Sequence, residues 1–208
     1  MRRLLRINLL QIGRRAVSSP PILSTVSFVS GPSTLLGWLL LASAVAATGV
    51  YVVGLQKFFL QSHSPSRHLV LFQEMNVAVA AIHAVGLVSR APAGPVWAGV
   101  GVGMYILGIV LFLAAIEAAR GTPLPRAFVL DRHPDRLITG GVFRVVRHPV
   151  YLSYLLAWFA GPVATHSPTL TGSAAALVAC YAVAAAREDR ALAWRFGQAY
   201  DVYRGTRR

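Results

Sequence analysis

Long apolar runs constrain the fold of this chain more than any other feature. Thr34–Leu55, Leu69–Val88 and Val96–Ala119 are each mostly apolar and carry few charges. A helix needs about 20 such residues to cross the hydrocarbon core of a bilayer. Of the 208 residues, 55% are hydrophobic and only 13% are charged, whereas soluble domains carry about 25% charged residues. The sequence therefore predicts an all-α, polytopic integral membrane protein that forms a single domain over residues 1–208.

Two further apolar runs, Pro149–Val163 and Leu170–Ala186, follow a long polar segment. As a helix, the first would be about 22 Å long, against a hydrocarbon core of about 30 Å. We expect about five transmembrane helices, of which the last two form a tight helical hairpin over 149–186. The other expected segments are a basic N-terminal segment over 1–33, three transmembrane helices over 34–119, a cytoplasmic loop over 120–148 and a C-terminal cytoplasmic helix over 187–208.

Glycines in the third apolar run form a Gly-x-x-x-Gly pattern at Gly99 and Gly103. This spacing places both glycines on one helix face and would let a second helix approach closely. The pattern is common in apolar runs, so packing is the only role that we assign to it.

The net charge of +13 comes almost entirely from arginine, which accounts for nineteen of the twenty basic residues. If the polar segment over 120–147 is inside, fourteen basic residues lie inside and six outside, an orientation that the positive-inside rule favours. The five arginines of residues 1–33 oppose it, and would lie outside on anionic headgroups. Arginine in place of lysine suggests a GC-rich genome, so we expect a bacterial inner (plasma) membrane with the active site facing the cytoplasm.

Most of the arginines cluster at the ends of the apolar runs, where the bilayer's headgroups account for them. The lipid bilayer is therefore an expected partner. No nucleic acid is expected, because the chain offers no soluble basic face, and no obligate protein partner is evident. Cys180 is the single cysteine and lies in an apolar run, so we expect neither a disulfide nor a metal site.

The tripeptide Arg-His-Pro occurs twice, ending at Pro134 and at Pro149. Charged residues follow the first copy, which predicts a solvated loop element. Proline in the second copy falls at the first turn of an expected helix, so His148 lies just outside it. The N–H groups of Val150, Tyr151 and Leu152 would then attract an anion. Interfacial anchoring by Arg, His and Tyr explains this stretch equally well.

The C-terminal segment adds carboxylates to the same side of the membrane. Glu188, Leu192, Phe196 and Tyr200 are four residues apart, so we expect them to form one stripe on a continuous helix. Asp189 supplies a second carboxylate. The alternative is that both acids pair with neighbouring arginines on a wet surface, as such charges usually do.

Together these segments resemble the isoprenylcysteine carboxyl methyltransferase and phospholipid methyltransferase family of integral membrane enzymes. That family shows Gly-x-Tyr, then Arg-His-Pro-x-Tyr, then a Glu-Glu pair followed by Leu, Phe-Gly and two tyrosines. The resemblance covers roughly residues 110–205, with Phe143 in place of the first Tyr and Asp189 in place of the second Glu. The matching residues are Gly141, Arg147, His148, Pro149, Tyr151, Glu188, Leu192, Phe196, Gly197, Tyr200 and Tyr203.

The resemblance implies an S-adenosylmethionine-dependent methyltransferase. His148 and the helix-start N–H groups would hold the donor's carboxylate, with Arg147 adding charge, and Glu188 would hold its ammonium, with Asp189 less certain because its side chain is shorter. The expected catalytic residues are Glu188, Arg147 and Tyr151. The expected cofactor-binding residues are Gly141, Arg147, His148, Pro149, Val150, Tyr151, Leu152, Glu188, Asp189, Leu192, Phe196 and Tyr200.

The methyl acceptor would be lipophilic or membrane-associated, and its identity stays open. An isoprenylcysteine-type carboxylate, a phospholipid amine and a small thiol all remain possible. Glu74, inside the second apolar run, is a candidate acceptor-side group. Two other functions compete: a membrane reductase using a nicotinamide cofactor, and a non-enzymatic haem-binding or scaffold protein using His63, His68 or His83.

Overall fold

The structure is a computed structural model that describes residues 32, 34–62, 65–125 and 134–205. Within these residues the regular secondary structure is helical, which confirms the predicted all-α class. The basic N-terminal segment lies outside the described residues except for Pro32. The helices are α1 (Leu35–Phe58), α2 (Arg67–Ser89), α3 (Pro95–Ala119), the short 3-10 helix η1 (Gly141–Arg144), α4 (Pro149–Thr165), α5 (Pro168–Phe196) and α6 (Gln198–Gly205).

Four of the described helices, α1, α2, α3 and α5, are long and apolar enough to cross a membrane. Helix α4 has 17 residues, which gives a length of about 26 Å, slightly short of a hydrocarbon core of about 30 Å. With α4, the bundle of the described residues has five long helices, and α4 is the shorter arm of the hairpin that it forms with α5 (Pro168–Phe196). The described part of the chain therefore has the architecture expected of a polytopic membrane protein.

Local signals fix where the helices begin. The side chains of Thr34 and Ser66 cap α1 and α2 by accepting a hydrogen bond from the backbone N–H three residues on, at 3.1 and 3.2 Å. Proline occupies the first turn of α3, α4 and α5, at Pro95, Pro149 and Pro168. Its missing N–H costs nothing there, and its fixed φ suits the helix.

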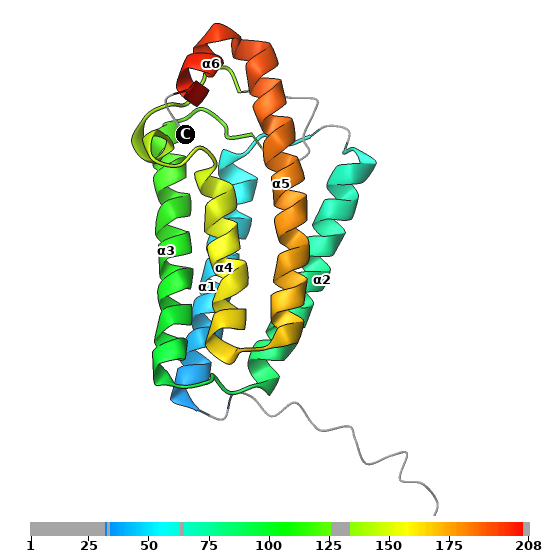
Figure 1. Cartoon of the computed structure of the whole chain (residues 1–208), viewed down its shortest axis with the longest axis vertical. Helices are drawn as coiled ribbons and strands as arrows, with labels where there is room; N and C mark the ends of the chain where they lie inside the picture. The colour runs from blue at the N-terminus through cyan, green and yellow to red at the C-terminus, as the bar shows by residue number, and fades with distance from the viewer. Residues whose placement is uncertain (1–31, 33, 63–64, 126–133, 206–208) are drawn as a thin grey trace, which may run out of the picture.

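Successive helices run up and down the bundle (Figure 1). The start of α1, the α2–α3 connection and the α4–α5 turn lie at one end. The opposite end carries the end of α1, the start of α2, the end of α3, residues 134–148 and α6. We call this opposite end the site end, because residues 134–148, the last turns of α5 and α6 meet there.

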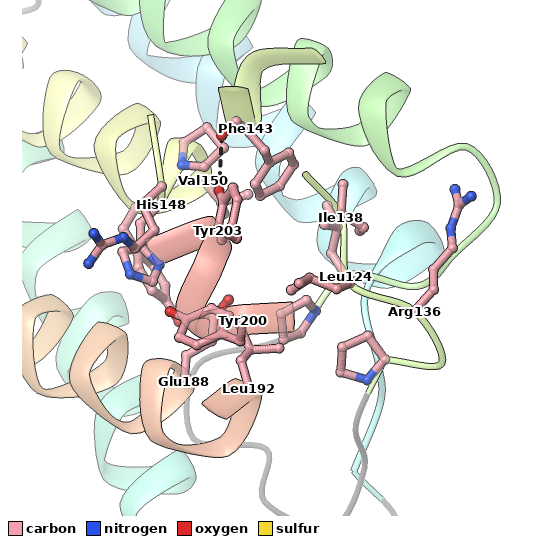
Figure 2. Close-up of a pocket in the computed structure, with 16 residues that line it drawn as sticks. Leu124, Arg136, Ile138, Phe143, His148, Val150, Glu188, Leu192, Tyr200 and Tyr203 are labelled. Carbon is pink, nitrogen blue, oxygen red and sulfur yellow. Dashed lines mark hydrogen bonds between the residues drawn. The ribbon is translucent and has the colours of Figure 1, made fainter. Parts of the chain in front are cut away.

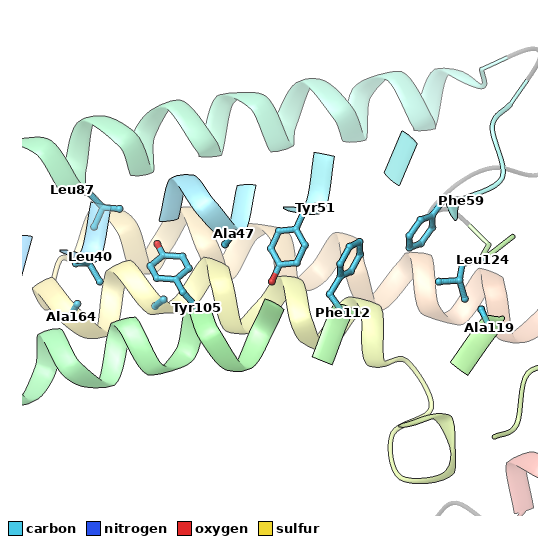
Figure 3. Close-up of a cluster of buried hydrophobic side chains, with 11 residues drawn as sticks. Leu40, Ala47, Tyr51, Phe59, Leu87, Tyr105, Phe112, Ala119, Leu124 and Ala164 are labelled. Carbon is cyan, nitrogen blue, oxygen red and sulfur yellow. The ribbon is translucent and has the colours of Figure 1, made fainter. Parts of the chain in front are cut away.

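A row of buried aromatic and aliphatic side chains runs along α1, α3 and α4 (Figure 3). Tyr51 packs edge-on against Phe112, with ring centroids 4.9 Å apart, and Phe59 stacks on Phe112 at 5.9 Å. At the site end, the Leu124 N–H donates to the Phe58 carbonyl and the Leu60 N–H donates to the Leu124 carbonyl, both at 2.9 Å. These bonds fasten the segment after α3 to the end of α1.

Close packing of α3 depends on glycines other than those that the sequence pattern indicated. A Cβ on Gly101 would lie 2.9 Å from the Ala160 carbonyl oxygen, and one on Gly108 would lie 2.9 Å from that of Ser153. The backbones of α3 and α4 therefore touch at these two positions. A Cβ on Gly99 or Gly103 would meet no atom of another helix within 4 Å, so the prediction that they form the packing face was wrong.

The C-terminal segment is two helices rather than the single continuous helix predicted from the four-residue spacing. Helix α5 continues to Phe196, and Gly197 then ends it with a φ of +50°. Glycine adopts this left-handed region at little cost. Helix α6 turns back over the site end (Figure 1), where Tyr200 and Tyr203 are buried.

Candidate functional site

The start of α4 presents two backbone donors rather than the three that were expected. Pro149 has no N–H, and the Leu152 N–H already donates to the His148 carbonyl at 3.1 Å. The N–H groups of Val150 and Tyr151 are left as the unsatisfied donors of the first turn. Leu152 is 38% exposed and does not line the pocket described below, so its place among the binding residues stays a prediction.

Asp189 joins the start of α4 to both C-terminal helices. Its carboxylate accepts a hydrogen bond from His148 Nε2 at 3.0 Å and another from the Tyr200 hydroxyl. Arg147 Nη1 lies 3.6 Å from its other oxygen. Only 22% of the Asp189 side chain is exposed. It contacts these three partners and does not line the pocket described below. It therefore positions the site's elements, whereas the sequence had suggested a ligand contact.

The ionisable groups around Asp189 are held in particular protonation states. Burial lowers the pKa of His148, against the opposing effect of the Asp189 carboxylate. Burial, and then the hydrogen bond to Asp189, raise the pKa of the Tyr200 phenol. At neutral pH, His148 is therefore a neutral imidazole and Tyr200 an un-ionised phenol, so the carboxylate is paired mainly with neutral donors.

Glu188 points the other way and lines a pocket at the site end (Figure 2). Its carboxylate pairs with the Tyr151 hydroxyl on the first turn of α4. Positive charge comes from Arg147, which also lines the pocket. A carboxylate thus faces a cation and a helix start across one space, an arrangement that suits a zwitterionic ligand. We call this space the donor pocket; its lining residues are Leu124, Pro125, Pro134, Arg136, Leu137, Ile138, Phe143, Arg147, His148, Pro149, Val150, Tyr151, Glu188, Leu192, Tyr200 and Tyr203.

Helix α6 closes one wall of the donor pocket. The Tyr203 hydroxyl donates to the Phe143 carbonyl at 2.9 Å, the bond drawn in Figure 2. Arg147 Nη2 donates to the Arg204 carbonyl at 3.4 Å. With the bond from Tyr200 to Asp189, these contacts place both tyrosines of α6 at the pocket, although α6 is a separate helix from α5.

Two residues of the predicted set act outside the donor pocket. Gly141 has a φ of +55°, and a Cβ there would lie 2.8 Å from Ala118 Cβ, so this glycine lets η1 pack against α3. Phe196 does not line the pocket, and the Arg195 guanidinium lies 5.9 Å from its ring centroid. Its place among the cofactor-binding residues rested on a stripe along one continuous helix, whereas α5 ends at Phe196; that place stays a prediction.

The segment between α3 and α4 supplies pocket residues that the sequence did not indicate. Leu124 and Ile138 form an apolar wall (Figure 2). Arg136 is fixed at the end of α3, where its guanidinium donates to Thr122 Oγ1 at 2.6 Å and to the Ala119 carbonyl at 2.7 Å. The six arginines of residues 120–147 indicated a basic segment, but their spacing could not show which of them bonds the end of a helix.

The first Arg-His-Pro copy lies outside the described residues apart from Pro134. This proline lines the donor pocket, and its carbonyl accepts from Arg195 Nε at 3.0 Å. The end of the first copy is thus part of the site's scaffold, although the sequence suggested only a solvated loop.

A second, larger cavity of about 450 Å³ lies inside the bundle, between α1, α2, α4 and α5. Pro125, Val150 and Tyr151 line both this cavity and the donor pocket, so the two spaces share a wall at the first turn of α4. We call it the bundle cavity; its other lining residues are Thr48, Tyr51, Val52, Leu55, Phe59, Leu69, Phe72, Gln73, Asn76, Val77, Ala80, Tyr154, Trp158 and Tyr181. Glu74 is exposed and is not among them.

Comparison with known proteins identifies the family from the segment that carries this geometry. The model of a family described as phospholipid methyltransferase matches residues 96–199. The chain belongs to the phospholipid methyltransferase family. No curated protein and no solved structure matches the chain.

The family match begins in α3 and ends in α6, so it takes in the helix start at His148 and both carboxylates. Membership, together with the apolar helices, makes this chain an integral membrane protein of a methyltransferase family. Helices α1 and α2 lie outside the match. These two helices provide more than half of the residues that line the bundle cavity. The family match therefore covers less than half of that lining.

Proposed function

We propose that this protein transfers a methyl group from S-adenosylmethionine to a lipophilic acceptor within the membrane. The observation that carries the proposal is the orientation of Glu188, whose carboxylate faces the donor pocket while the adjacent Asp189 is engaged by three side chains. When bound, the donor supplies an electrophilic methyl group on a sulfonium. Every other task falls to the protein.

The chemistry of the pocket's groups fits this donor. Glu188 would hold its ammonium, while Arg147 and the N–H groups of Val150 and Tyr151 would hold its carboxylate. Leu192 and Tyr200 offer apolar and aromatic surface for the nucleoside. His148, bound to Asp189 through Nε2, would act by keeping the start of α4 in place.

The volume of the donor pocket adds a condition. It encloses about 50 Å³, whereas sites that bury small ligands usually enclose about 300–1,000 Å³. Side chains of the pocket wall would therefore have to move apart on binding. Helix α6 closes one wall of the pocket, so its outward movement would enlarge the pocket, and the hydrogen bonds from Tyr203 to Phe143 and from Arg147 to Arg204 would then break.

The shared wall at Tyr151 explains how donor and acceptor would meet. An acceptor in the bundle cavity and a donor in the donor pocket would approach each other at the first turn of α4. Methyl transfer requires the acceptor atom to lie in line with the breaking bond, so positioning of this kind supplies much of the rate. The proposed setting is a bacterial inner membrane with the site end facing the cytoplasm, as the arginine distribution favours.

The competing functions receive less support from the described residues. His68 and His83 are fifteen positions apart on α2, or about 22 Å, so they cannot both ligate one haem iron. His83 instead bonds Ser173 at 3.1 Å and contacts the Trp158 ring. For a nicotinamide reductase, the donor pocket would need further phosphate-binding groups beyond Arg136 and Arg147.

Thermal unfolding of the purified protein in detergent tests the proposal. S-adenosylhomocysteine should raise the unfolding temperature in a concentration-dependent manner, because a ligand that binds only the folded state stabilises it. NADPH at the same concentrations should have no effect. Stabilisation by NADPH alone would favour the reductase and would refute the proposed function.

A further inference from the structure

Resting on the proposed function, we infer that the bundle cavity selects an acceptor with one hydrocarbon chain and an uncharged reactive group. The inference concerns the substrate class, which the family match leaves open because α1 and α2 lie outside it. Three features of the cavity support it: its lining, its volume and its opening.

The lining carries no ionisable acid or base apart from tyrosine. Among the described residues around the cavity there is no Asp, Glu, Lys, Arg or His. Placing an unpaired charge in such surroundings is costly. A phosphate headgroup or a carboxylate would find no counter-ion there, whereas a neutral thiol, hydroxyl or phenol would be tolerated.

The volume suits one chain. About 450 Å³ falls in the lower half of the range of about 300–1,000 Å³ that encloses drug-sized molecules. A diacyl phospholipid brings two long chains and a headgroup, and would leave at least one chain outside. The cavity can therefore enclose a single-chain acceptor more completely than a phospholipid.

The opening faces the lipid. Val52 of α1 and Val77 of α2 line the cavity, yet they are 48% and 65% exposed. The mouth therefore lies between α1 and α2, on the side that the bilayer would cover. A lipophilic molecule would enter sideways and extend toward Tyr151 at the shared wall.

Gln73 is a polar side chain of the cavity that is available to recognise the acceptor. Asn76 and Tyr181 are already used, because the Tyr181 hydroxyl donates to Asn76 Oδ1 at 2.9 Å while the Trp158 indole N–H donates to that hydroxyl at 3.1 Å. Gln73 also lines the cavity and makes no hydrogen bond within the described part of the chain. We assign Gln73 as a specificity-determining residue that would bond the neutral polar group.

The reaction balances without a further reactant. A lone pair of the acceptor atom forms the new bond to the methyl carbon as the carbon–sulfur bond breaks. The electrons of that bond neutralise the sulfonium and give S-adenosylhomocysteine. The proton of the acceptor's S–H or O–H group passes to water.

Methyl transfer from radiolabelled S-adenosylmethionine to three probes tests the inference: 1-dodecanethiol, dodecanoate and dioleoylphosphatidylethanolamine. The thiol should be methylated at least tenfold faster than either of the others. Gln73→Leu should reduce this preference, and Ala80→Trp, which fills the cavity, should lower the rate on the thiol at least tenfold. Ala78→Trp, on the exposed face of the same helix, should behave like wild type.

Stabilisation by S-adenosylhomocysteine separates the two proposals. Wild type and all three variants should keep it, which would also show that the variants are folded. Loss of this stabilisation in wild type would refute the proposed function. Donor binding with preferential methylation of the phospholipid, or of none of the probes, would overturn the acceptor class alone. Equal loss of activity in Ala78→Trp and Ala80→Trp would overturn the assignment of the cavity.

Discussion

At the scale of single residues, two adjacent carboxylates have different roles. Glu188 faces the donor pocket, whereas Asp189 bonds His148 and Tyr200 and lies beside Arg147. Consecutive side chains on a helix point about 100° apart, so two adjacent acids contact different neighbours. The sequence could place both acids near the helix start but could not tell which of them faces a ligand.

Asp189→Asn should destabilise the protein, although Asp189 is not one of the residues proposed to contact S-adenosylmethionine. Loss of the charge weakens the contacts that hold α4, α5 and α6 together, at a cost of about 1–3 kcal/mol. For a chain of this size, we expect the unfolding temperature to fall by several degrees in a detergent melt. Asp201→Asn, on the exposed side of α6, is the control and should leave it unchanged. Equal unfolding temperatures for both variants would contradict the positioning role.

His148 should make stability depend on pH. Burial holds the pKa of His148 in the folded protein below the ordinary histidine value of 6.5. Below pH 6.5, therefore, the unfolded chain binds more protons than the native one, and stability falls as the pH falls. In His148→Gln, which keeps a donor near Asp189 but does not titrate, this loss should be smaller. Melting curves from pH 8 to pH 5 measure the difference, and parallel curves would show that His148 does not titrate as described.

At the scale of elements, the contact between η1 and α3 has a defined steric limit. Gly141 has a left-handed φ, and a Cβ there would clash with Ala118. Gly141→Ala should cost about 1–3 kcal/mol, displace the loop that carries Arg147 and weaken donor binding.

The adjacent glycine provides the matched control for that substitution. Gly140 has a φ of −93° and a Cβ there would meet nothing within 4 Å, so Gly140→Ala should be tolerated. Unfolding temperature and S-adenosylhomocysteine affinity measure both variants. Indistinguishable behaviour of the two alanines would contradict the described packing.

The helices show which sequence signals are sufficient. Apolar length predicted α3, α4 and α5, and proline at the first turn predicted where α4 begins, because the bilayer and the fixed φ of proline leave few alternatives. The break at Gly197 was missed, since a spacing of four residues continues through it and the turn depends on contacts far away, such as Tyr203 with Phe143. The same applies to Gly101 and Gly108, whose role depends on where α4 lies.

At the scale of the whole molecule, one end of the bundle gathers the polar chemistry. Residues 134–148, the end of α5 and α6 all lie there, and the start of α1 lies at the opposite end (Figure 1). Fourteen of the twenty basic residues belong to segments expected at the site end. In this orientation the five arginines of residues 1–33 lie outside, which the positive-inside rule does not favour.

Reporter fusions in bacteria test the orientation. A green fluorescent protein fused after Arg208 should fluoresce, because it folds in the cytoplasm. The same reporter fused before Met1 should be dark, while alkaline phosphatase there should be active. The reverse pattern would place the donor pocket on the side that lacks the methyl donor, and would contradict the proposed orientation.

The central claim is that Glu188 holds the ammonium of S-adenosylmethionine in the donor pocket, and calorimetric titration of the purified protein with S-adenosylhomocysteine tests it most directly. Wild type should bind, and Glu188→Gln should lose at least tenfold in affinity, a change of about 1.4 kcal/mol or more. Glu117→Gln, an exposed acid at the end of α3, should bind like wild type. Undiminished binding by Glu188→Gln would contradict the claim.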